Sequence, residues 1–284
     1  MIKIIVYSKD RPMQLDLALR STAEYFRLPH MTDVLWTATN EEYEKGYKEL
    51  FKIYKGNSYF SNLHFIKQTN FRNDTLKMIN ADYDYLTVIG DDVVFNKPIT
   101  KVDGEVFEKI FDHYQEEMLA VNYRLGKNMK GKYKDSPEEV PPVFMAHYLT
   151  HLNLFYIWNW QMAKRDGKVE WGYPMNLMCQ FYRRDDIVNY WPNLKFNCPN
   201  SLEGAMMQNI INKPLMVCFE ESKVLEFCLN IVQSAAPQNR HGNTTTKELN
   251  DIWLDSYRIS FEAIEVADSS FSRHLDPHLH LIER

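Results

Sequence analysis

The stretch Tyr85-Leu-Thr-Val-Ile-Gly-Asp-Asp-Val-Val-Phe95 decides the fold that this sequence predicts. Its first half is apolar and β-branched, which is typical of a strand buried in a parallel sheet. Gly90 then interrupts the strand and is followed by Asp91 and Asp92, which we call the acid pair. Because ligands of open α/β sheets bind beyond the carboxyl ends of the strands, we expect the acid pair at a binding site. Two carboxylates suit a hard divalent cation, although Gly-Asp-Asp is also an ordinary turn sequence.

Strand and helix patterns alternate around this stretch. The predicted strands are residues 2–7, 33–39, 63–66, 85–89 and 118–123. The predicted helices begin at Pro12, after the N-cap Asn40, near Asn70 and near Asp103. This alternation predicts an α/β fold, in which a mostly parallel sheet is flanked by helices on both faces.

Residues 126–142 interrupt the alternation. Their four lysines are Lys127, Lys130, Lys132 and Lys134. Because no apolar periodicity survives here, we predict a mobile connector or lid between two halves, residues 1–125 and residues 143–284. An ordinary solvated connector explains the same pattern equally well.

The second half has a less regular pattern. Residues 143–196 are crowded with aromatic side chains, and residues 177–182 predict a strand. Residues 200–211 and 246–266 carry apolar residues at helical spacing and predict two amphipathic helices. The last residues have a weak pattern, so we expect them to fray.

The composition describes an ordinary globular protein of 284 residues, 45% of them hydrophobic, which can bury a sizeable core. A formal net charge of -5 argues against a general nucleic-acid binder, because such proteins carry an excess of Lys and Arg. The four cysteines include no CxxC pair, which favours a reduced, cytoplasmic protein. No apolar run has the length of a membrane span, so we expect no transmembrane segment; peripheral membrane contact stays open.

Polar residues are expected at the same edge of the sheet as the acid pair. Lys9, Asp10 and Arg11 follow the first strand, and Arg72 and Asp74 open the helix before the acidic strand. Cations and helix N-termini bind phosphates, while hydrogen-bonding side chains bind a base or a ribose. Taken singly, each of these residues also suits a solvated loop.

Two segments together resemble the GT-A glycosyltransferases. They are Ile2-Lys-Ile-Ile-Val-Tyr-Ser-Lys-Asp-Arg-Pro12 and Phe71-Arg-Asn-Asp-Thr-Leu-Lys-Met-Ile-Asn-Ala-Asp-Tyr-Asp-Tyr-Leu-Thr-Val-Ile-Gly-Asp-Asp-Val-Val-Phe95, and they fall in roughly the first third of the chain. The resemblance implies a GT-A-like sheet with a nucleotide-sugar-binding half at residues 1–125 and an acceptor-binding half at residues 143–284. The residues that it implies in donor binding are Tyr7, Ser8, Asp10, Arg11, Arg72, Asp74 and Asp91.

The same resemblance makes the acid pair a variant of the Asp-x-Asp motif, which binds the metal of the nucleotide sugar. It implies Asp92 as the ligand of a divalent metal, Mn²⁺ or Mg²⁺, and His241 as a further ligand from a Gly-containing loop. Gly90 or Ile89 stands where the family usually has its first acid, so a metal-independent enzyme is an alternative. His241 could also be an exposed loop residue, and Arg240 beside it could meet a phosphate.

Inverting members of this family place a carboxylate base near the start of a helix in the acceptor half. Glu203 has this position, and the base would take a proton from the acceptor hydroxyl. Asn200 followed three residues later by Glu203 is also a capping-box pattern, which requires no catalysis. Asp185 and Asp186 are the alternative bases. The histidines interpreted as structural or acceptor-lining are His147 and His151, which are four residues apart.

The expected activity is transfer of a sugar from a nucleotide sugar, with a UDP-sugar expected first, to a hydroxyl group of a saccharide or another acceptor. The product would be a glycan or polysaccharide. A sugar nucleotidyltransferase is one alternative, but it normally has a Gly-rich phosphate loop after the first strand, unlike Ser8-Lys-Asp-Arg-Pro12. The other is a non-catalytic carbohydrate-binding protein on a degenerate transferase fold, which the missing first acid favours.

Overall fold

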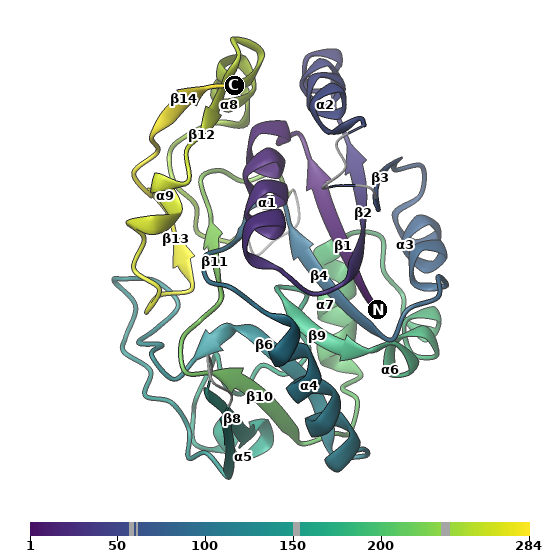
Figure 1. The fold of residues 1–284 in the computed structure, drawn as a ribbon, viewed down its shortest axis with the longest axis vertical. Helices are drawn as coiled ribbons and strands as arrows, with labels where there is room; N and C mark the ends of the chain where they lie inside the picture. The colour runs from purple at the N-terminus through teal and green to yellow at the C-terminus, as the bar shows by residue number, and fades with distance from the viewer. Residues whose placement is uncertain (57–59, 61, 150–153, 234–238) are drawn as a thin grey trace.

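A computed structural model describes residues 1–56, 60, 62–149, 154–233 and 239–284. A nine-stranded sheet runs through its centre in the order β3-β2-β1-β4-β9-β6-β10-β8-β7 (Figure 1). Its strands are β1 (Ile2–Lys9), β2 (His30–Thr37), β3 (Leu63–Lys67), β4 (Tyr85–Gly90), β6 (Met118–Gly126), β7 (Ala146–Leu149), β8 (Leu154–Asn159), β9 (Gln180–Arg183) and β10 (Leu215–Phe219). Following the strand pairs across the sheet, all strands run in one direction except β8 and β9. The predicted α/β fold with a mostly parallel sheet is confirmed.

Helices cover both faces of this sheet. They are α1 (Pro12–Tyr25), α2 (Glu41–Tyr54), α3 (Phe71–Ile79), α4 (Lys101–His113), α5 (Trp160–Arg165), α6 (Arg184–Val188), α7 (Pro199–Gln208), α8 (Thr246–Leu254) and α9 (Glu262–Glu265). Side chains of α1, α2, α4 and α8 belong to one hydrophobic core, and those of α3, α5, α6 and α7 belong to the other. Figure 1 shows α1 in front of the sheet and α7 behind it. Because successive strand residues face opposite sides, Ile4 and Val6 of β1 enter the first core, whereas Ile5 and Tyr7 enter the second.

A small sheet brings distant parts of the chain to the acid pair. Its order is β13-β11-β5, and its strands are β5 (Val93–Phe95), β11 (Val224–Phe227) and β13 (Arg273–His274). Glu226 pairs with Val93 on one side and with Arg273 on the other. The backbone N–H of Phe227 donates to the carbonyl of Asp92 at 2.7 Å. Residues far apart in the sequence therefore lie directly beside the acid pair.

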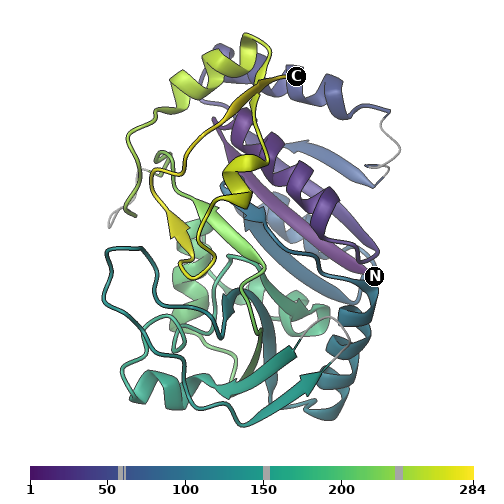
Figure 2. The ribbon, with the colours of Figure 1, turned by 60° about the vertical axis from the view of Figure 1, so that its left-hand side comes forward.

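The two predicted halves share the central sheet. β9, from residues 143–284, lies between β4 and β6, which belong to residues 1–125 except for Gly126 at the end of β6. The predicted connector, residues 126–142, is hydrogen-bonded to the C-terminal segment, because the N–H of Arg273 donates to the carbonyl of Lys132 at 2.9 Å. Figure 2 shows the yellow C-terminal segment beside the teal connector. A role of the connector as a lid stays a prediction.

The C-terminal region differs from its prediction. The helix predicted at residues 246–266 ends at Leu254, because Ser256 adopts a left-handed backbone with a φ of 70°. β12 (Tyr257–Ile259) then pairs with β14 (Leu281–Glu283). The predicted fraying was therefore wrong, since backbone hydrogen bonds hold the last residues in a two-stranded sheet.

The helix predicted at residues 200–211 is α7, which begins one residue earlier. Its N-cap is Cys198, and Ser201 completes the capping box. The predicted N-cap at Asn200 was wrong, because Pro199 takes the first helical position, where its missing N–H costs nothing. Glu203 is consequently free of the capping role that its spacing from Asn200 suggested.

Two other segments also differ from their predictions. The strand predicted at residues 177–182 begins only at Gln180 and ends at Arg183, because Cys179 has a φ of 54° and interrupts the extended backbone. His147 lies on strand β7, so the helical spacing proposed for His147 and His151 does not apply. His151 itself lies outside the described residues.

Candidate active site

The acid pair lies in the turn between β4 and β5, at the carboxyl end of β4 and beside the end of β1. The backbone N–H of Asp91 donates to the carbonyl of Tyr7 at 3.1 Å. Asp91 is buried, whereas the side chain of Asp92 is 16% exposed. A Cβ atom on Gly90 would lie 2.5 Å from Oδ1 of Asp92. This turn has no room for the acid that the family usually carries before its aspartates unless Asp92 moves.

One guanidinium group bridges the acid pair. Nη1 of Arg11 donates to Oδ1 of Asp91 at 3.0 Å and to Oδ2 of Asp92 at 2.9 Å. Nε and Nη2 of Arg11 donate to the side-chain and backbone oxygens of Asn230, at 2.7 and 2.6 Å. Burial by itself lowers the pKa of Arg11, but the charges of Asp91 and Asp92 outweigh burial and raise it. Arg11 therefore stays charged and joins the loop after β1, the turn after β4 and the segment after β11.

The loop after β1 also meets the acid pair directly. Oδ2 of Asp91 accepts hydrogen bonds from Oγ of Ser8 at 2.8 Å and from the backbone N–H of Lys9 at 3.1 Å. Oγ of Ser8 lies 2.6 Å from the hydroxyl of Tyr47. Burial raises the pKa of Asp91 to about 6, against the opposing charge of Arg11. Both carboxylate oxygens of Asp91 are thus engaged inside the protein.

The predicted divalent metal needs uncommitted oxygen or imidazole ligands around the acid pair. Both oxygens of Asp91 accept hydrogen bonds, and Oδ2 of Asp92 accepts one from Arg11. His241 is exposed, and its Nδ1 lies 2.7 Å from the carbonyl of Gly242. Within the described ranges, no three or more His, Cys, Asp or Glu side chains form a group that could hold a metal ion. This arrangement does not fit a metal centre, and the metal stays a prediction from the resemblance.

Tyr7 and Asp10 support the loop after β1 from within. The hydroxyl of Tyr7 lies 3.3 Å from Oγ1 of Thr75, and burial raises the pKa of Tyr7. Asp10 has a φ of 57°, and its carboxylate accepts from the N–H and the hydroxyl of Thr39 at 2.7 and 3.0 Å. These contacts shape the loop, and direct contact of either side chain with a nucleotide stays a prediction.

Arg72 and Asp74 make their hydrogen bonds away from the acid pair. Asp74 accepts from the backbone N–H groups of Thr69 and Asn70 at 2.7 and 2.8 Å. Burial alone would raise the pKa of Asp74, but these hydrogen bonds lower it. Nη2 of Arg72 donates to the carbonyl of Pro192 at 2.7 Å. Both residues hold the start of α3 in place, and their donor-binding roles stay predictions.

Glu203 lies on α7, with both of its carboxylate oxygens held. Oε1 accepts from the hydroxyl of Tyr173, and Oε2 accepts from the backbone N–H of Leu177, each at 2.9 Å. At the start of the same helix, Nδ2 of Asn200 donates to Oε1 of Gln233 at 2.7 Å. The segment after β11, which also bonds to Arg11, therefore reaches from the acid pair to the helix that carries Glu203.

The alternative bases lie at the opposite edge of the sheet. β9 runs antiparallel to β4, so Asp185 and Asp186 follow β9 at the end where β4 begins. There the N–H of Arg184 donates to the carbonyl of Asp84 at 2.9 Å, and Asp186 pairs with Lys213 at 2.6 Å. The reversed direction of β9, which sequence periodicity does not reveal, separates both aspartates from the acid pair.

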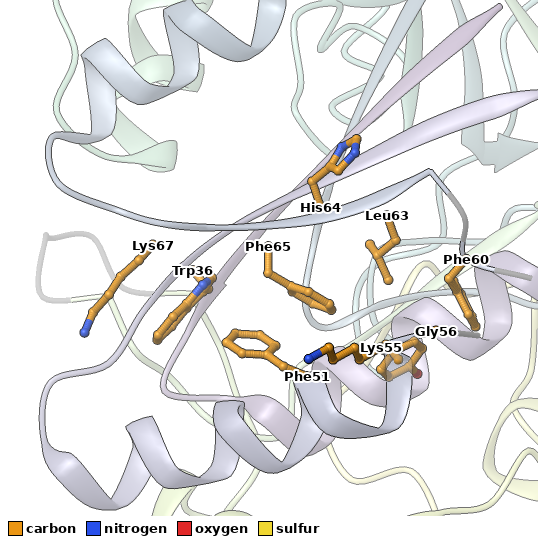
Figure 3. Close-up of a pocket in the computed structure, with 10 residues that line it drawn as sticks. Trp36, Phe51, Lys55, Gly56, Phe60, Leu63, His64, Phe65 and Lys67 are labelled. Atoms are coloured by element: carbon orange, nitrogen blue, oxygen red, sulfur yellow. The ribbon is translucent and has the colours of Figure 1, made fainter. Parts of the chain in front are cut away.

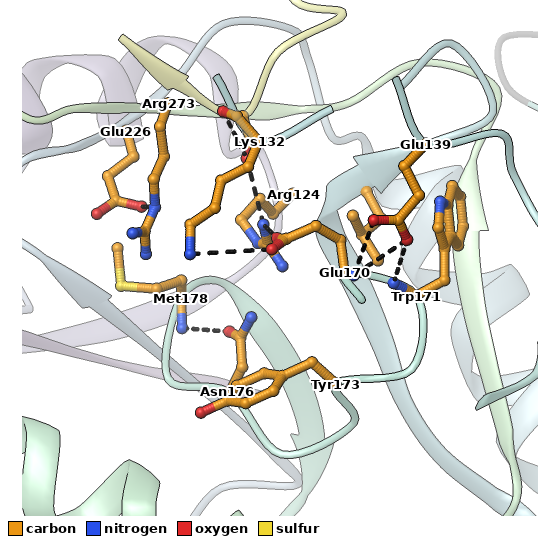
Figure 4. A network of polar contacts seen from close by, with 12 residues as sticks. Arg124, Lys132, Glu139, Glu170, Trp171, Tyr173, Asn176, Met178, Glu226 and Arg273 are labelled. Atoms are coloured by element: carbon orange, nitrogen blue, oxygen red, sulfur yellow. Dashed lines mark hydrogen bonds and ion pairs between the residues drawn. The ribbon is translucent and has the colours of Figure 1, made fainter. Parts of the chain in front are cut away.

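A network of charged residues beside the acid pair was missed by the sequence analysis (Figure 4). Oε2 of Glu226 on β11 lies 2.6 Å from Nε of Arg273 on β13. Burial raises the pKa of Glu226, while Arg273 opposes this effect and Asp92 adds to it. Deeper in the network, Nη1 of Arg124 pairs with Oε2 of Glu170. The one signal in the sequence was Glu226 itself, an acid inside the apolar run Val-Leu-Glu-Phe.

A separate pocket of about 770 Å³ lies between α2 and β3, at the edge of the central sheet (Figure 3). The aromatic residues that line it are Trp36, Phe51, Tyr54, Phe60 and Phe65. The ring of Trp36 packs on Tyr47 with centroids 4.8 Å apart, and Tyr47 in turn contacts Ser8. The pocket thus lies behind the loop after β1 and includes neither aspartate of the acid pair.

Arg240, which could meet a phosphate, is paired with the connector. Its Nη1 and Nη2 donate to the two carboxylate oxygens of Asp135 at 2.8 and 2.7 Å. All four cysteines are free thiols, and Cys179, Cys218 and Cys228 are buried. In the part of the chain that the structure describes, no helix combines the length and the apolar character needed to cross a bilayer.

Comparison with known proteins gives a distant named relative. No protein-family model matches the chain. The bifunctional glycosyltransferase pgtA of Dictyostelium discoideum is 24% identical over 246 residues, an alignment that covers 78% of this chain and 30% of pgtA. The chain therefore spans less than a third of that protein.

Solved structures match only loosely. TarS 1-349 of S. aureus in complex with UDP-GlcNAc has 15% identity and a TM-score of 0.43, and covers 76% of this chain and 55% of that chain. TarS 1-349 in complex with UDP has 15% identity and a TM-score of 0.45, and covers 76% and 57%. The galactosyltransferase LgtC in complex with donor and acceptor sugar analogs has 13% identity and a TM-score of 0.29, and covers 43% and 47%.

Proposed function

We propose that this protein transfers a glycosyl group from a nucleotide sugar to an acceptor hydroxyl, in glycan or polysaccharide synthesis. The observation that carries the proposal is the contact of the loop after β1 with the acid pair, through Ser8, Lys9 and Arg11. Ligands of open α/β sheets bind at such an edge. The distant similarity to pgtA, a protein named as a glycosyltransferase, supports the same class. UDP-sugars are the donors to test first.

Glu203 is the base in the proposed reaction. Its carboxylate takes the proton of the acceptor hydroxyl while the hydroxyl oxygen bonds to the anomeric carbon and the nucleoside diphosphate leaves. The hydroxyl of Tyr173 and the N–H of Leu177 each bond to one oxygen of Glu203, which fixes the orientation of the carboxylate. Each oxygen keeps a second acceptor site for the acceptor hydroxyl. This role requires inversion at the anomeric carbon.

A cytoplasmic location is part of the proposal. The four free cysteines support it, because thiols persist in reducing compartments and pair in oxidising ones. The requirement for a divalent metal is tested by experiment. The resemblance implies Asp92 as the metal ligand, whereas in the structure Arg11 bridges Asp91 and Asp92.

The test is release of nucleoside diphosphate from a panel of nucleotide sugars, with saccharide acceptors, in the presence of Mn²⁺ and in the presence of a chelator. We expect Glu203→Gln to lower turnover about 10²- to 10⁴-fold, the usual contribution of a general base. Glu105→Gln, an exposed position on α4, is the matched control and should leave turnover unchanged.

The two alternative functions predict different results in this test. Pyrophosphate chemistry would support a sugar nucleotidyltransferase, and binding of nucleotide sugars without release of any product would support a carbohydrate-binding protein. Equal turnover of Glu203→Gln and the intact protein would remove Glu203 from the chemistry. Loss of activity in Asp92→Asn together with a strict requirement for Mn²⁺ would support the predicted metal.

A further inference from the structure

Three neighbouring strands connect the acid pair to the connector. β5 follows the acid pair, β11 pairs with β5, and β13 pairs with β11. Beyond β13, the N–H of Arg273 donates to the carbonyl of Lys132 at 2.9 Å. Gly131, next to Lys132, forms a bridge with Phe271. The backbone of the connector at Lys132 is therefore an extension of the small sheet that borders the acid pair.

The side chain of Lys132 turns back into the charged network. Figure 4 shows it between Arg273 on one side and Arg124 with Glu170 on the other, reaching toward Met178. Its side chain is 36% exposed, whereas Lys130 and Lys134, two positions away in each direction, are exposed residues. Of these three connector lysines, Lys132 is the one directed into the charged network.

The other cations near the acid pair are already committed to partners. Arg11 uses Nε, Nη1 and Nη2 for Asp91, Asp92 and Asn230. Arg124 pairs with Glu170, and Arg273 pairs with Glu226.

Lys132 differs from these arginines. Its ammonium nitrogen forms a long ion pair with Oε1 of Glu170 at 3.9 Å, which is beyond hydrogen-bond distance, and among the described residues it donates no hydrogen bond. Burial lowers the pKa of Lys132, and the charge of Arg273 lowers it further, while the charges of Glu170 and Glu226 oppose this effect. Because Glu170 is also the partner of Arg124, one carboxylate is shared by two cations, and an anionic ligand can supply the negative charge that this cluster lacks.

We propose that Lys132 binds an oxyanion of the ligand, a phosphoryl group of the donor or a carboxylate of the acceptor. The inference rests on the proposed function and assigns it a residue from the segment that the sequence predicts as a mobile connector or lid. Three N–H donors of the ammonium group are available to such an oxyanion, and no metal is needed for the contact. Lys132 thereby selects ligands by charge.

The experiment measures binding directly, by calorimetry on the full chain without turnover. The probes are UDP, inorganic pyrophosphate and glucuronate, each titrated into the intact protein and into Lys132→Met. A charge-assisted hydrogen bond is worth enough that its loss should weaken binding about 10- to 100-fold. Lys134→Met on the same connector is the matched control and should bind like the intact protein. Lys132→Arg keeps the charge and should restore most of the affinity.

The outcomes separate the two sources of the oxyanion. Weaker binding of UDP and pyrophosphate to Lys132→Met assigns the contact to a phosphoryl group, and weaker binding of glucuronate alone assigns it to a carboxylate. Equal affinity of Lys132→Met and Lys134→Met for all three probes overturns the inference, as does an intact protein that binds none of them. Thermal unfolding of each variant verifies the fold, and Lys132→Gln replaces Lys132→Met if that variant is unfolded.

The same data distinguish this inference from the proposed function. If the intact protein binds UDP and Lys132→Met and Lys134→Met bind it equally well, the glycosyltransferase proposal stands and Lys132 is removed from the binding site. If the intact protein binds pyrophosphate through Lys132 but binds UDP no more tightly than pyrophosphate, the oxyanion site stands and a nucleotide donor is contradicted.

Discussion

Nη1 of Arg11 lies 3.0 Å from Oδ1 of Asp91, and both side chains are buried. The contact joins the loop after β1 to the turn that ends β4. Because Asn230 accepts from the other nitrogens of the same guanidinium, the segment after β11 is tied to this pair as well. The acid pair therefore holds three segments of the fold together in addition to forming a candidate binding site. Its substitution should lower the free energy of unfolding as well as affect any activity.

Arg11→Met should destabilise the fold by about 3–5 kcal/mol, the usual cost of leaving buried charges without their partner. Arg11→Lys should recover only part of this loss, because one ammonium group cannot reproduce the planar fork that meets Asp91 and Asn230 together. Urea unfolding followed by circular dichroism measures the free energy of unfolding. Arg27→Met, at an arginine whose side chain is 60% exposed, is the control and should change it little. A free energy unchanged in Arg11→Met would contradict the central role of the pair.

The titration of Asp91 should make stability depend on pH. Burial raises its pKa to about 6 in the folded protein, from an ordinary value of 3.8. The folded state therefore holds this proton more tightly than the unfolded state, so the stabilisation from Asp91 is complete below pH 3.8 and is lost as the pH rises to about 6. Asp91→Asn should remove this slope.

The measurement is the free energy of unfolding of Asp91→Asn relative to the intact protein, across this pH range. The variant should gain relative stability as the pH rises, whereas Asp112→Asn, at an exposed position on α4, should follow the intact protein. A relative stability of Asp91→Asn that falls over the same range would reverse the sign and show that Arg11 outweighs burial at Asp91.

Substitution of Gly126 and of Gly204 by alanine should change the stability of the protein in opposite directions. A Cβ atom on Gly126, at the end of β6, would lie 2.3 Å from the backbone nitrogen of Ser222, whereas one on Gly204 in α7 would meet nothing within 4 Å. Gly126→Ala should cost about 1–3 kcal/mol because backbone has to move. Gly204→Ala should gain about 0.5–1 kcal/mol, since alanine loses less conformational entropy in a helix. Thermal unfolding of both variants provides the comparison, and a stabilised Gly126→Ala would contradict the close approach.

The sequence by itself determined the fold class and the location of the acid pair. The alternation of strands and helices is a local property that side-chain periodicity records, and parallel strands joined by helices all end at one edge of their sheet. Ser8 and Asp91 therefore had to meet at the edge where the structure places them. Some ends of helices and strands were predicted wrongly, such as the helix end at Leu254. They depend on single residues with a left-handed backbone, and side-chain periodicity does not encode that backbone angle.

Only the tertiary structure decided which charges face one another. Arg11 lies between the two aspartates, and Asn230, from a distant segment, holds it there. Glu226, Arg273 and Lys132 come together because three short strands, far apart in the chain, pair beside the acid pair. Pairing between distant strands depends on the packing of the whole molecule and leaves no trace in the local pattern of any one segment. For this reason an aperiodic stretch, predicted as a mobile connector or lid, carries a cation that enters the charged network beside the acid pair.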